Sequence, residues 1–289
     1  MEIRTNEPMA RHTSFRVGGP ADRFMIPESE AELREAVLDC KKSGQPWYMI
    51  GNGSNLLVGD KGFRGTIIST ERLIELEVQR HENTIIAGAG VMLSKLANTA
   101  AREELTGLEF AAGIPGTVGG AVMMNAGAYG SEMKNVLLWV DVMDQDGNVK
   151  RLKNEELELG YRTSCLERLG LFAVRAAFKL TPGDPEAIRL QMEELARKRK
   201  EKQPLEYPSA GSTFKRPEGY FAGKLIEDAG LKGFSVGGAA VSEKHAGFVI
   251  NKDHGTAADI LGLCNEVKHR VKENSGVDME LEVKLLGEF

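Results

Sequence analysis

The chain has few of the residues that build disulfides and metal sites. It holds three cysteines and five histidines among 289 residues. The histidines show no HExxH-type spacing, so the sequence predicts no metal site. The cysteines lie too far apart for a CxxC metal or redox pair, and an odd, sparse count suits a reducing cytosol. They are Cys40, Cys165 and Cys264.

An excess of basic residues and long apolar runs are also missing. The formal net charge is −5 and the sequence pI is about 5.7, which argues against nucleic acid or an anionic membrane as a partner. No apolar run approaches the roughly 20 residues of a membrane span. The first residues carry charges at Glu2 and Arg4 and no hydrophobic segment, so we expect no secretory signal. We therefore expect a soluble cytoplasmic protein.

Glycine, in contrast, is abundant and clustered. Seven of the 24 residues from Gly107 to Gly130 are glycine, in GLEFAAGIPGTVGGAVMMNAGAYG, and Glu109 is the only charge. This composition suits a buried backbone close to a flat or anionic ligand, because a missing Cβ lets main-chain N–H groups approach a phosphate. The alternative is a tight turn packed between two sheets. The segment predicts a nucleotide or cofactor cradle.

A second loop of small residues, GNGSNLL at 51–57, follows the apolar run Trp47–Ile50, which we expect to be a strand. Its Gly, Asn and Ser residues can present donors to a diphosphate, although Asn-Gly is also a common hairpin turn. Neither loop is a standard phosphate motif. The chain has no Gly-Lys-Ser/Thr, and the Gly-x-Gly pairs at 51–53 and 88–90 lack a third glycine. A P-loop enzyme and a simple Rossmann domain are excluded.

Periodicity and capping signals predict alternating helices and strands. The capping box Ser29–Glu32 predicts a helix that ends at Gly44. The run Thr181–Pro185 is the expected domain boundary. The basic run Arg197–Lys200 is interpreted as a solvated helix face, and His245 as a structural hydrogen-bond donor. Further helices are expected near 94–105, 186–202 and 256–273, and strands at 136–143, 149–152 and 172–180.

Taken together, GNGSNLLV and GIPGTVGGAVMMNAGAYG resemble the flavin site of the UDP-N-acetylenolpyruvoylglucosamine reductase (MurB) family of peptidoglycan synthesis. The resemblance covers nearly the whole chain, and the short spacing from Arg162 to Ser212 is similar to the type without an extra Tyr loop. Six more blocks carry it: HTSFRVGGPADRF at 12–24, GYRTS at 160–164, PSAGSTFKRP at 208–217, AGKLIEDAGLKG at 222–233, VSEKHAGFVIN at 241–251 and ELEVKLLG at 280–287.

The resemblance implies an α+β fold with two parts. Residues 1–182 would form the flavin-binding fold of the vanillyl-alcohol-oxidase (PCMH) type, in subdomains near 1–70 and 71–182. Residues 183–289 would form an α+β substrate-binding domain. Periodicity alone does not select this topology.

The family is an NADPH-dependent flavoenzyme that reduces UDP-N-acetylglucosamine enolpyruvate to UDP-N-acetylmuramate. NADPH reduces the FAD, which then delivers hydride to the enol ether, and a serine supplies the proton. The resemblance assigns Arg162 to the substrate carboxylate, Glu282 to the developing enolate and Ser212 to protonation. Without the resemblance they would pass as a surface ion pair, an exposed strand position and a turn residue. Leu281, Val283 and Leu285 are expected to point inward.

The resemblance also implies binding residues. Non-covalent FAD is expected, because neither loop holds a His or Cys to anchor it. The expected FAD contacts are Gly51, Asn52, Gly53, Ser54, Asn55, Leu56, Gly113, Ile114, Pro115, Gly116, Gly119, Gly120, Asn125, Ala126, Gly127 and Arg175. The expected substrate contacts are Tyr129, Tyr161, Lys215, Arg216 and Lys224, with the cations at the UDP diphosphate.

Two rival functions are weighed. One is an alcohol or hydroxy-acid oxidase of the same flavin fold, which would have no need of the PSAGSTFKRP and ELEVKLLG blocks. The other is a non-catalytic nucleotide-binding or scaffold protein. The presence of Arg162, Ser212 and Glu282 together speaks against it.

Overall fold

The computed structural model describes all residues, 1–289, and the chain forms two compact units. The first unit comprises Met1–Arg4, Arg23–Asn52 and Gly65–Arg199. The second comprises Thr5–Asp22, Gly53–Arg64 and Lys200–Phe289. Four elements contain residues of both units: β1 (Glu2–Pro8), β2 (Pro20–Ile26), β5 (Phe63–Ser69) and α5 (Pro185–Lys202).

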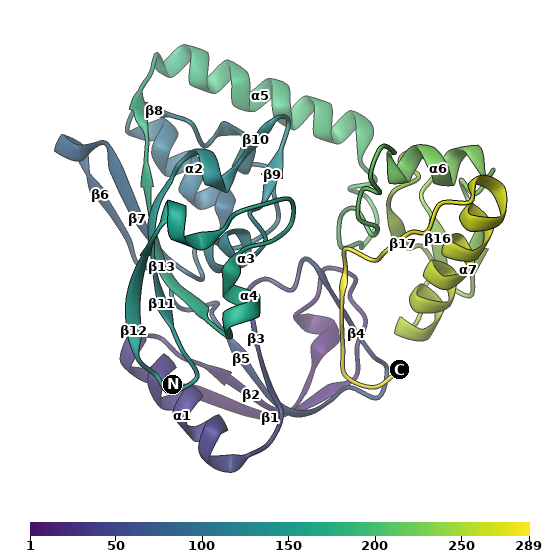
Figure 1. The fold of residues 1–289 in the computed structure, drawn as a ribbon, viewed down its shortest axis with the longest axis horizontal. Helices are drawn as coiled ribbons and strands as arrows, with labels where there is room; N and C mark the ends of the chain where they lie inside the picture. The colour runs from purple at the N-terminus through teal and green to yellow at the C-terminus, as the bar shows by residue number, and fades with distance from the viewer. The chain divides into compact units, whose positions relative to one another are not determined.

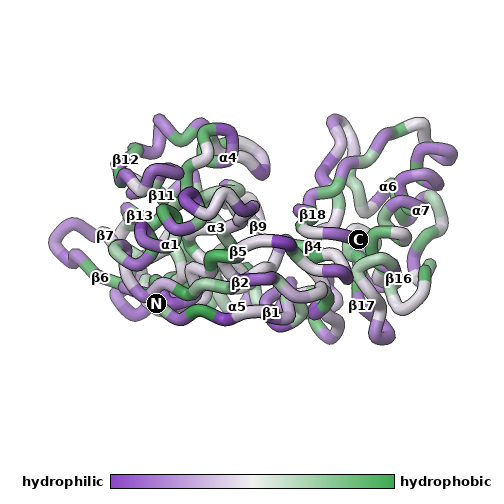
Figure 2. Tube along the Cα trace, turned by 90° about the horizontal axis from the view of Figure 1, so that it is seen from below, coloured by the Kyte–Doolittle hydropathy of each residue, from purple (hydrophilic) through white to green (hydrophobic).

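The first unit is built on a five-stranded antiparallel sheet in the order β12-β11-β13-β7-β6, and α3 packs on β13 and β7 (Figure 1). The turn that joins β6 to β7 is hydrophilic (Figure 2). Its helices, apart from most of α5, are α1 (Glu30–Ser43), α2 (Leu93–Arg102), α3 (Val118–Met123) and α4 (Cys165–Leu169). Its strands are β3 (Trp47–Ile50), β6 (Leu76–Gln79), β7 (Thr84–Gly88), β8 (Leu105–Thr106), β9 (Gly127–Ala128), β10 (Ser131–Glu132), β11 (Leu137–Met143), β12 (Val149–Lys153), β13 (Phe172–Lys179) and β14 (Thr181–Pro182).

The core of this unit follows from helical and strand spacing. Helix α2 buries Leu93, Leu96, Ala97 and Ala100, which recur at the spacing of one helix face. They pack in the same core as Phe178 of β13. Each fully buried leucine contributes about 1.5–3 kcal/mol relative to an exposed one. This core holds the back of α3 and so the glycine-rich segment that contains it.

Helix α1 begins and ends where the sequence predicted. Ser29 Oγ accepts the N–H of Glu32 at 3.2 Å, and Gly44 ends the helix with a left-handed φ of 65°. The helix buries the predicted face of Leu33, Ala36, Val37 and Cys40. A four-stranded sheet has the order β1-β2-β5-β3, in which β3 runs parallel to β5.

The second unit contains a three-stranded antiparallel sheet, β15-β16-β17, on which α7 packs. The predicted stripe of Ile260, Leu263, Val267 and Val271 on α7 is buried. The carboxylate of Asp60 caps α7 by accepting its first main-chain N–H groups. The elements are β4 (Leu56–Val58), α6 (Ala222–Asp228), β15 (Ser235–Val236), β16 (Ala239–Val241), β17 (Val249–Asn251), α7 (Ala257–Ser275) and β18 (Lys284–Leu286).

The predicted alternation at the end of the chain is wrong. Leu285 was expected to point inward and is 46% exposed, whereas Glu282 is 9% exposed. The reason is that the regular strand β18 begins only at Lys284, where it pairs in parallel with Leu56 of β4. Residue 281 instead forms an isolated bridge with Phe214, so a simple period of two does not hold through this stretch.

None of the helices combines the length and the apolar composition needed to cross a membrane. The structure also contains no group of three or more His, Cys, Asp and Glu side chains that could hold a metal ion.

Candidate active site

Residues 51 and 52 of the first small-residue loop contact the glycine-rich segment within the first unit. Asn52 Nδ2 donates a 2.7 Å hydrogen bond to the carbonyl of Pro115. A Cβ on Gly51 would lie 2.2 Å from Thr117 Oγ1, so only glycine fits there. Gly51 and Asn52 are therefore packed against Pro115 and Thr117, which brings the two segments expected to form the cofactor cradle together.

Thr117 tests whether this surface fits FAD. Its Oγ1 is buried and has no hydrogen-bond partner in the protein, a state that costs about 1–3 kcal/mol unless a ligand satisfies it. At Gly120 the space of a missing Cβ is open, with Thr117 Oγ1 the nearest atom at 3.8 Å. A bare backbone beside an unsatisfied hydroxyl fits a nucleotide cofactor. The sequence reasoning missed Thr117, although it lies inside the GIPGTVGG motif.

Gly119 has a different environment from Gly120. A Cβ on Gly119 would lie 3.0 Å from Ala89 Cβ, and its N–H already donates to the carbonyl of Ala89. Gly119 therefore lets α3 approach the end of β7 closely. Its contact with FAD stays a prediction.

Asn125 links the end of the cradle to the turn that carries Arg162. The Asn125 side chain is 1% exposed; its amide donates to the carbonyl of Gly160 at 3.1 Å and accepts the N–H of Lys134 at 2.9 Å. Its side chain is thus occupied within the protein, and any FAD contact would come from its main chain. The adjoining Ala126 and Gly127 continue into β9.

Arg162 and Tyr129 share an unusual backbone state. Gly160 and Thr163 exchange main-chain hydrogen bonds around a two-residue turn, in which Arg162 has a φ of 53°. Tyr129 stands at the β9–β10 turn with a φ of 55°. The left-handed region costs a residue with a side chain about 1–2 kcal/mol, and such strain gathers at functional sites. Two predicted site residues therefore occupy strained turn tips, with the Arg162 guanidinium 5.3 Å from the Tyr161 ring.

In the second unit, Thr213 follows Ser212 in the chain and is hydrogen-bonded to Glu282. Ser212 is exposed and the Thr213 beside it is buried. The main-chain N–H of Thr213 donates to Gly247, and its carbonyl accepts the N–H of Glu282 at 2.9 Å. One buried residue thus adjoins Ser212 in the chain and holds the main chain of Glu282 by a hydrogen bond.

Asn55, predicted to contact FAD, also holds the Glu282 segment. Its Nδ2 donates to the carbonyl of Glu282 at 3.0 Å, and its own carbonyl accepts the N–H of Lys284. Gly53 has a φ of 58°, and a Cβ there would lie 1.9 Å from the carbonyl oxygen of His12. Of the other residues in the 51–57 loop, Ser54 is half-buried and Leu56 is buried in β4.

The predicted diphosphate cations are exposed and lie in the second unit. Lys215 pairs with Glu280 at 2.9 Å. Lys224 pairs with Asp228 through a hydrogen bond of 2.5 Å. The Arg216 guanidinium lies 3.9 Å from the centre of the Phe221 ring. Their contact with a diphosphate stays a prediction.

His245 serves as an acceptor rather than the donor expected from the sequence. Its Nδ1 accepts the N–H of Gly247 at 3.1 Å, the residue whose carbonyl holds Thr213. Burial lowers the pKa of His245, which favours the neutral ring that this bond requires.

Arg175, a predicted flavin contact, pairs with the buried Asp141 at 2.8 Å. Arg151 binds the same carboxylate through two hydrogen bonds. Burial acts to raise the pKa of Asp141, but the two guanidinium groups outweigh it and hold the pKa below its ordinary value. Arg175 thus helps neutralise a buried charge on the sheet, and its contact with FAD stays a prediction.

The sequence predicts a solvated helix face for the basic run at 197–200, and this prediction is wrong for Arg199. Arg199 is half-buried against Gly113. The reason is that Gly113 has no side chain, which leaves room for the arginine stem.

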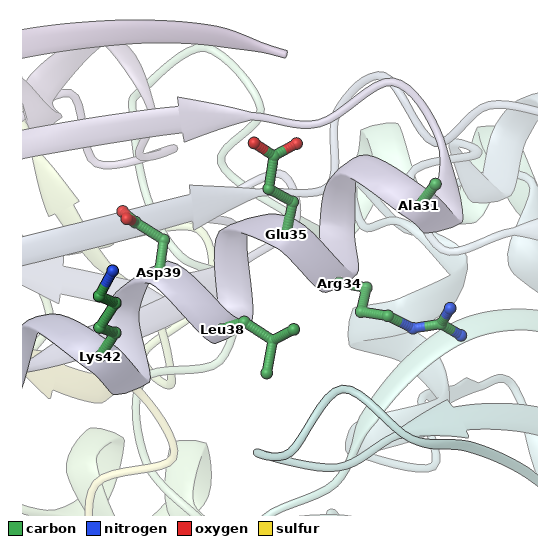
Figure 3. A pocket seen from close by; sticks show the side chains of 6 residues that line it. All are labelled: Ala31, Arg34, Glu35, Leu38, Asp39 and Lys42. Carbon is green, nitrogen blue, oxygen red and sulfur yellow. The ribbon is translucent and has the colours of Figure 1, made fainter.

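A shallow depression runs along α1, and none of the predicted site residues lines it (Figure 3). A single helix supplies all of its lining side chains, so polar groups do not converge on it from several elements as in a ligand site. The lining residues are Ala31, Arg34, Glu35, Leu38, Asp39 and Lys42.

Comparison with known proteins accounts for both units. Residues 203–286 match the family described as UDP-N-acetylenolpyruvoylglucosamine reductase, C-terminal domain, and residues 21–153 match an FAD binding domain. The reductase of Caldanaerobacter subterraneus is 52% identical over 287 residues, covering 99% of this chain and 94% of the relative. The chain belongs to the UDP-N-acetylenolpyruvoylglucosamine reductase family. The Clostridium novyi reductase is also 52% identical, over 99% of this chain and 93% of its own length.

Solved structures support the fold. The crystal structure of the MurB reductase from Thermus caldophilus is 37% identical, with a TM-score of 0.83 over 99% of this chain and 98% of that one. The grass pollen allergen Phl p 4, a glucose dehydrogenase, has a TM-score of 0.51 at 16% identity over 63% of this chain, which shows a shared fold alone. The predicted family and the predicted flavin-binding fold with a C-terminal α+β domain are confirmed.

Proposed function

We propose that Arg162, Ser212 and Glu282 perform the chemistry of a UDP-N-acetylenolpyruvoylglucosamine reductase. Family membership establishes the overall reaction, which is the FAD-dependent reduction of the enolpyruvyl sugar nucleotide in peptidoglycan synthesis. The observation that carries the assignment is the 52% identity over nearly the full length of this chain and of its relatives. The residue roles and the use of NADPH as hydride donor are our proposal.

In the first unit, FAD would contact the main chain of residues 51–52 and 113–120, with Thr117 Oγ1 as an additional hydrogen-bonding group; residues 53–56 stay predicted contacts. When bound, FAD supplies the hydride, taken from NADPH, that the terminal carbon of the enolpyruvyl double bond receives. The chain's own residues manage charge and protons around that event.

Arg162 would bind the carboxylate of the enolpyruvyl group, because its planar guanidinium matches two carboxylate oxygens. Glu282, which is buried, would help polarise the developing enolate by donating a hydrogen bond to it in the protonated form, since an ionised carboxylate would repel that negative charge. Ser212 Oγ would give its proton to the carbon that bears the charge. Its exposure to solvent allows the hydroxyl to regain a proton afterwards.

We also propose a division of labour along the chain. Residues 1–182 would bind FAD and residues 183–289 the UDP-sugar, with Lys215, Arg216 and Lys224 near its diphosphate and Tyr129 and Tyr161 near the sugar. The extents of the two matched families support this division. We place the reaction in the cytoplasm, where nucleotide-linked sugars and NADPH are available.

Stopped-flow absorbance of the two half-reactions tests the proposal. In Ser212→Ala, NADPH should bleach the flavin at close to the normal rate. Reoxidation by UDP-N-acetylglucosamine enolpyruvate should slow by roughly 10²–10⁴-fold, as for loss of a general acid. Glu282→Gln should show the same asymmetry, and Ser209→Ala in the same loop is the control.

Two outcomes would contradict the proposal. Normal reoxidation in Ser212→Ala would remove that serine from the mechanism. Rapid reaction of the reduced wild-type flavin with oxygen, without reaction with the enolpyruvyl substrate, would favour an oxidase of the same fold.

A further inference from the structure

The four basic residues at the end of α5, Arg197–Lys200, differ in their interaction partners. Arg197 pairs with Glu194 at 2.7 Å and Lys198 pairs with the same carboxylate at 3.2 Å, so both have an acidic partner on their own helix. Arg199 instead packs on the cofactor loop of the first unit. A Cβ on Gly113 would lie 3.2 Å from both its Cδ and its Nη1.

Arg199 has no acidic partner there. It forms no ion pair and no hydrogen bond within the protein, and the phenol of Tyr129 is close enough to interact with it electrostatically. Burial lowers the pKa of its guanidinium, as expected for a cation withdrawn from water without a counter-charge. Partial burial of a charge without a counter-charge is costly, and a ligand that supplies the opposite sign would offset this cost.

The position of the guanidinium indicates the kind of ligand. Gly113 begins the GIPG loop. The carbonyl of Pro115 in the same loop accepts a hydrogen bond from the side chain of Asn52, which belongs to the other predicted cofactor loop. Tyr129 stands at the strained turn that ends the cradle. Arg199 thus contacts the main chain expected to hold FAD and interacts electrostatically with a tyrosine expected to face the substrate.

We propose that Arg199 is an anion-binding residue of this site, and that its guanidinium takes phosphate oxygens of a bound nucleotide. The proposal deepens the proposed function, since it adds a ligand-binding residue to the same site. The planar fork of arginine pairs with two phosphate oxygens at once. Three nucleotides share this chemistry here: FAD, NADPH and the UDP-sugar.

Three binding measurements on Arg199→Met identify the source. The affinity for FAD is measured by quenching of flavin fluorescence on the flavin-free protein, which does not depend on activity. The affinity for NADPH comes from the concentration dependence of flavin bleaching. The affinity for the UDP-sugar comes from the concentration dependence of reoxidation. Arg197→Met, which removes a cation already paired on the helix, is the matched control.

Arg199→Met should weaken at least one of the three affinities by about tenfold or more, the range of a charge-assisted hydrogen bond. The affected affinity should also lose part of its dependence on salt, which a purely structural role would not change. The control should stay within about twofold. Unchanged affinities for all three nucleotides in a folded Arg199→Met protein would overturn the proposal.

Arg199→Lys keeps the inference testable if the methionine variant does not fold. It retains the charge but loses the fork, so the same affinity should fall measurably, and full retention of all three would overturn the proposal. Failure of the wild-type protein to reduce the enolpyruvyl substrate would count against the proposed function. The FAD measurement would still decide whether Arg199 binds the phosphates of FAD.

Discussion

The side-chain amide of Asn55 donates a 3.0 Å hydrogen bond to the main-chain carbonyl of Glu282. The carbonyl of Asn55 also accepts the N–H of Lys284, so the loop holds both sides of Glu282. A loop predicted to bind the cofactor is therefore also a support for the segment that carries a catalytic carboxylate.

Asn55→Ala should slow the reoxidation half-reaction by about fivefold, because one hydrogen bond of roughly 1 kcal/mol no longer positions Glu282. Bleaching by NADPH should stay near normal. Stopped-flow absorbance measures both. Asn52→Ala is the comparison, since its amide binds Pro115 and its loss should weaken FAD binding instead. Loss of FAD from Asn55→Ala with normal reoxidation would make Asn55 a cofactor ligand and not a support.

Arg162 is expected to be required for activity while its backbone conformation lowers the stability of the protein. Arg162→Gly and Arg162→Ala both remove the guanidinium and should both lose reoxidation by substrate. The glycine variant should be more stable than the alanine variant by about 1 kcal/mol, because the left-handed φ of 53° strains any residue with a Cβ. Denaturant unfolding of the two variants measures the difference. Equal stability would mean that the turn relaxes without cost.

Gly120 and Gly119 should respond differently to valine. Gly120→Val places a branched side chain in open space beside Thr117, so it should reduce the FAD content with little change in the melting temperature of the flavin-free protein. Gly119→Val forces a contact with Ala89 and should lower that melting temperature by several degrees. Full flavin content in Gly120→Val would show that this glycine does not face the cofactor.

Protonation of His245 should lower the free energy of unfolding in mild acid relative to neutral pH. Burial lowers its pKa in the folded state below its ordinary value of 6.5. The stabilisation is therefore fully present above about pH 6.5 and is lost as the pH falls below that value towards the folded pKa, because the unfolded chain binds the proton first. Unfolding free energies between about pH 5 and 8 should fall less steeply in His245→Gln. His269→Gln, at an exposed position on α7, is the control. An unchanged pH slope in His245→Gln would contradict this assignment.

The features that could be predicted from the sequence are those written in local patterns. The capping box at Ser29 and the apolar stripe of α7 encode their helices, since spacing and capping act within a few turns. The two glycine-rich loops and the short blocks around Arg162, Ser212 and Glu282 were enough to place the chain in its family.

The tertiary structure decided what those residues touch. Asn55 meets a residue 227 positions away, and Arg199 meets Gly113, which no local period can indicate. Glu282 is buried and Leu285 exposed because the ladder with β4 begins only at Lys284, against the alternation of the sequence. Gly119 and Gly120 are adjacent and identical in type, yet one faces Ala89 and the other open space, because packing depends on which segments meet across the fold.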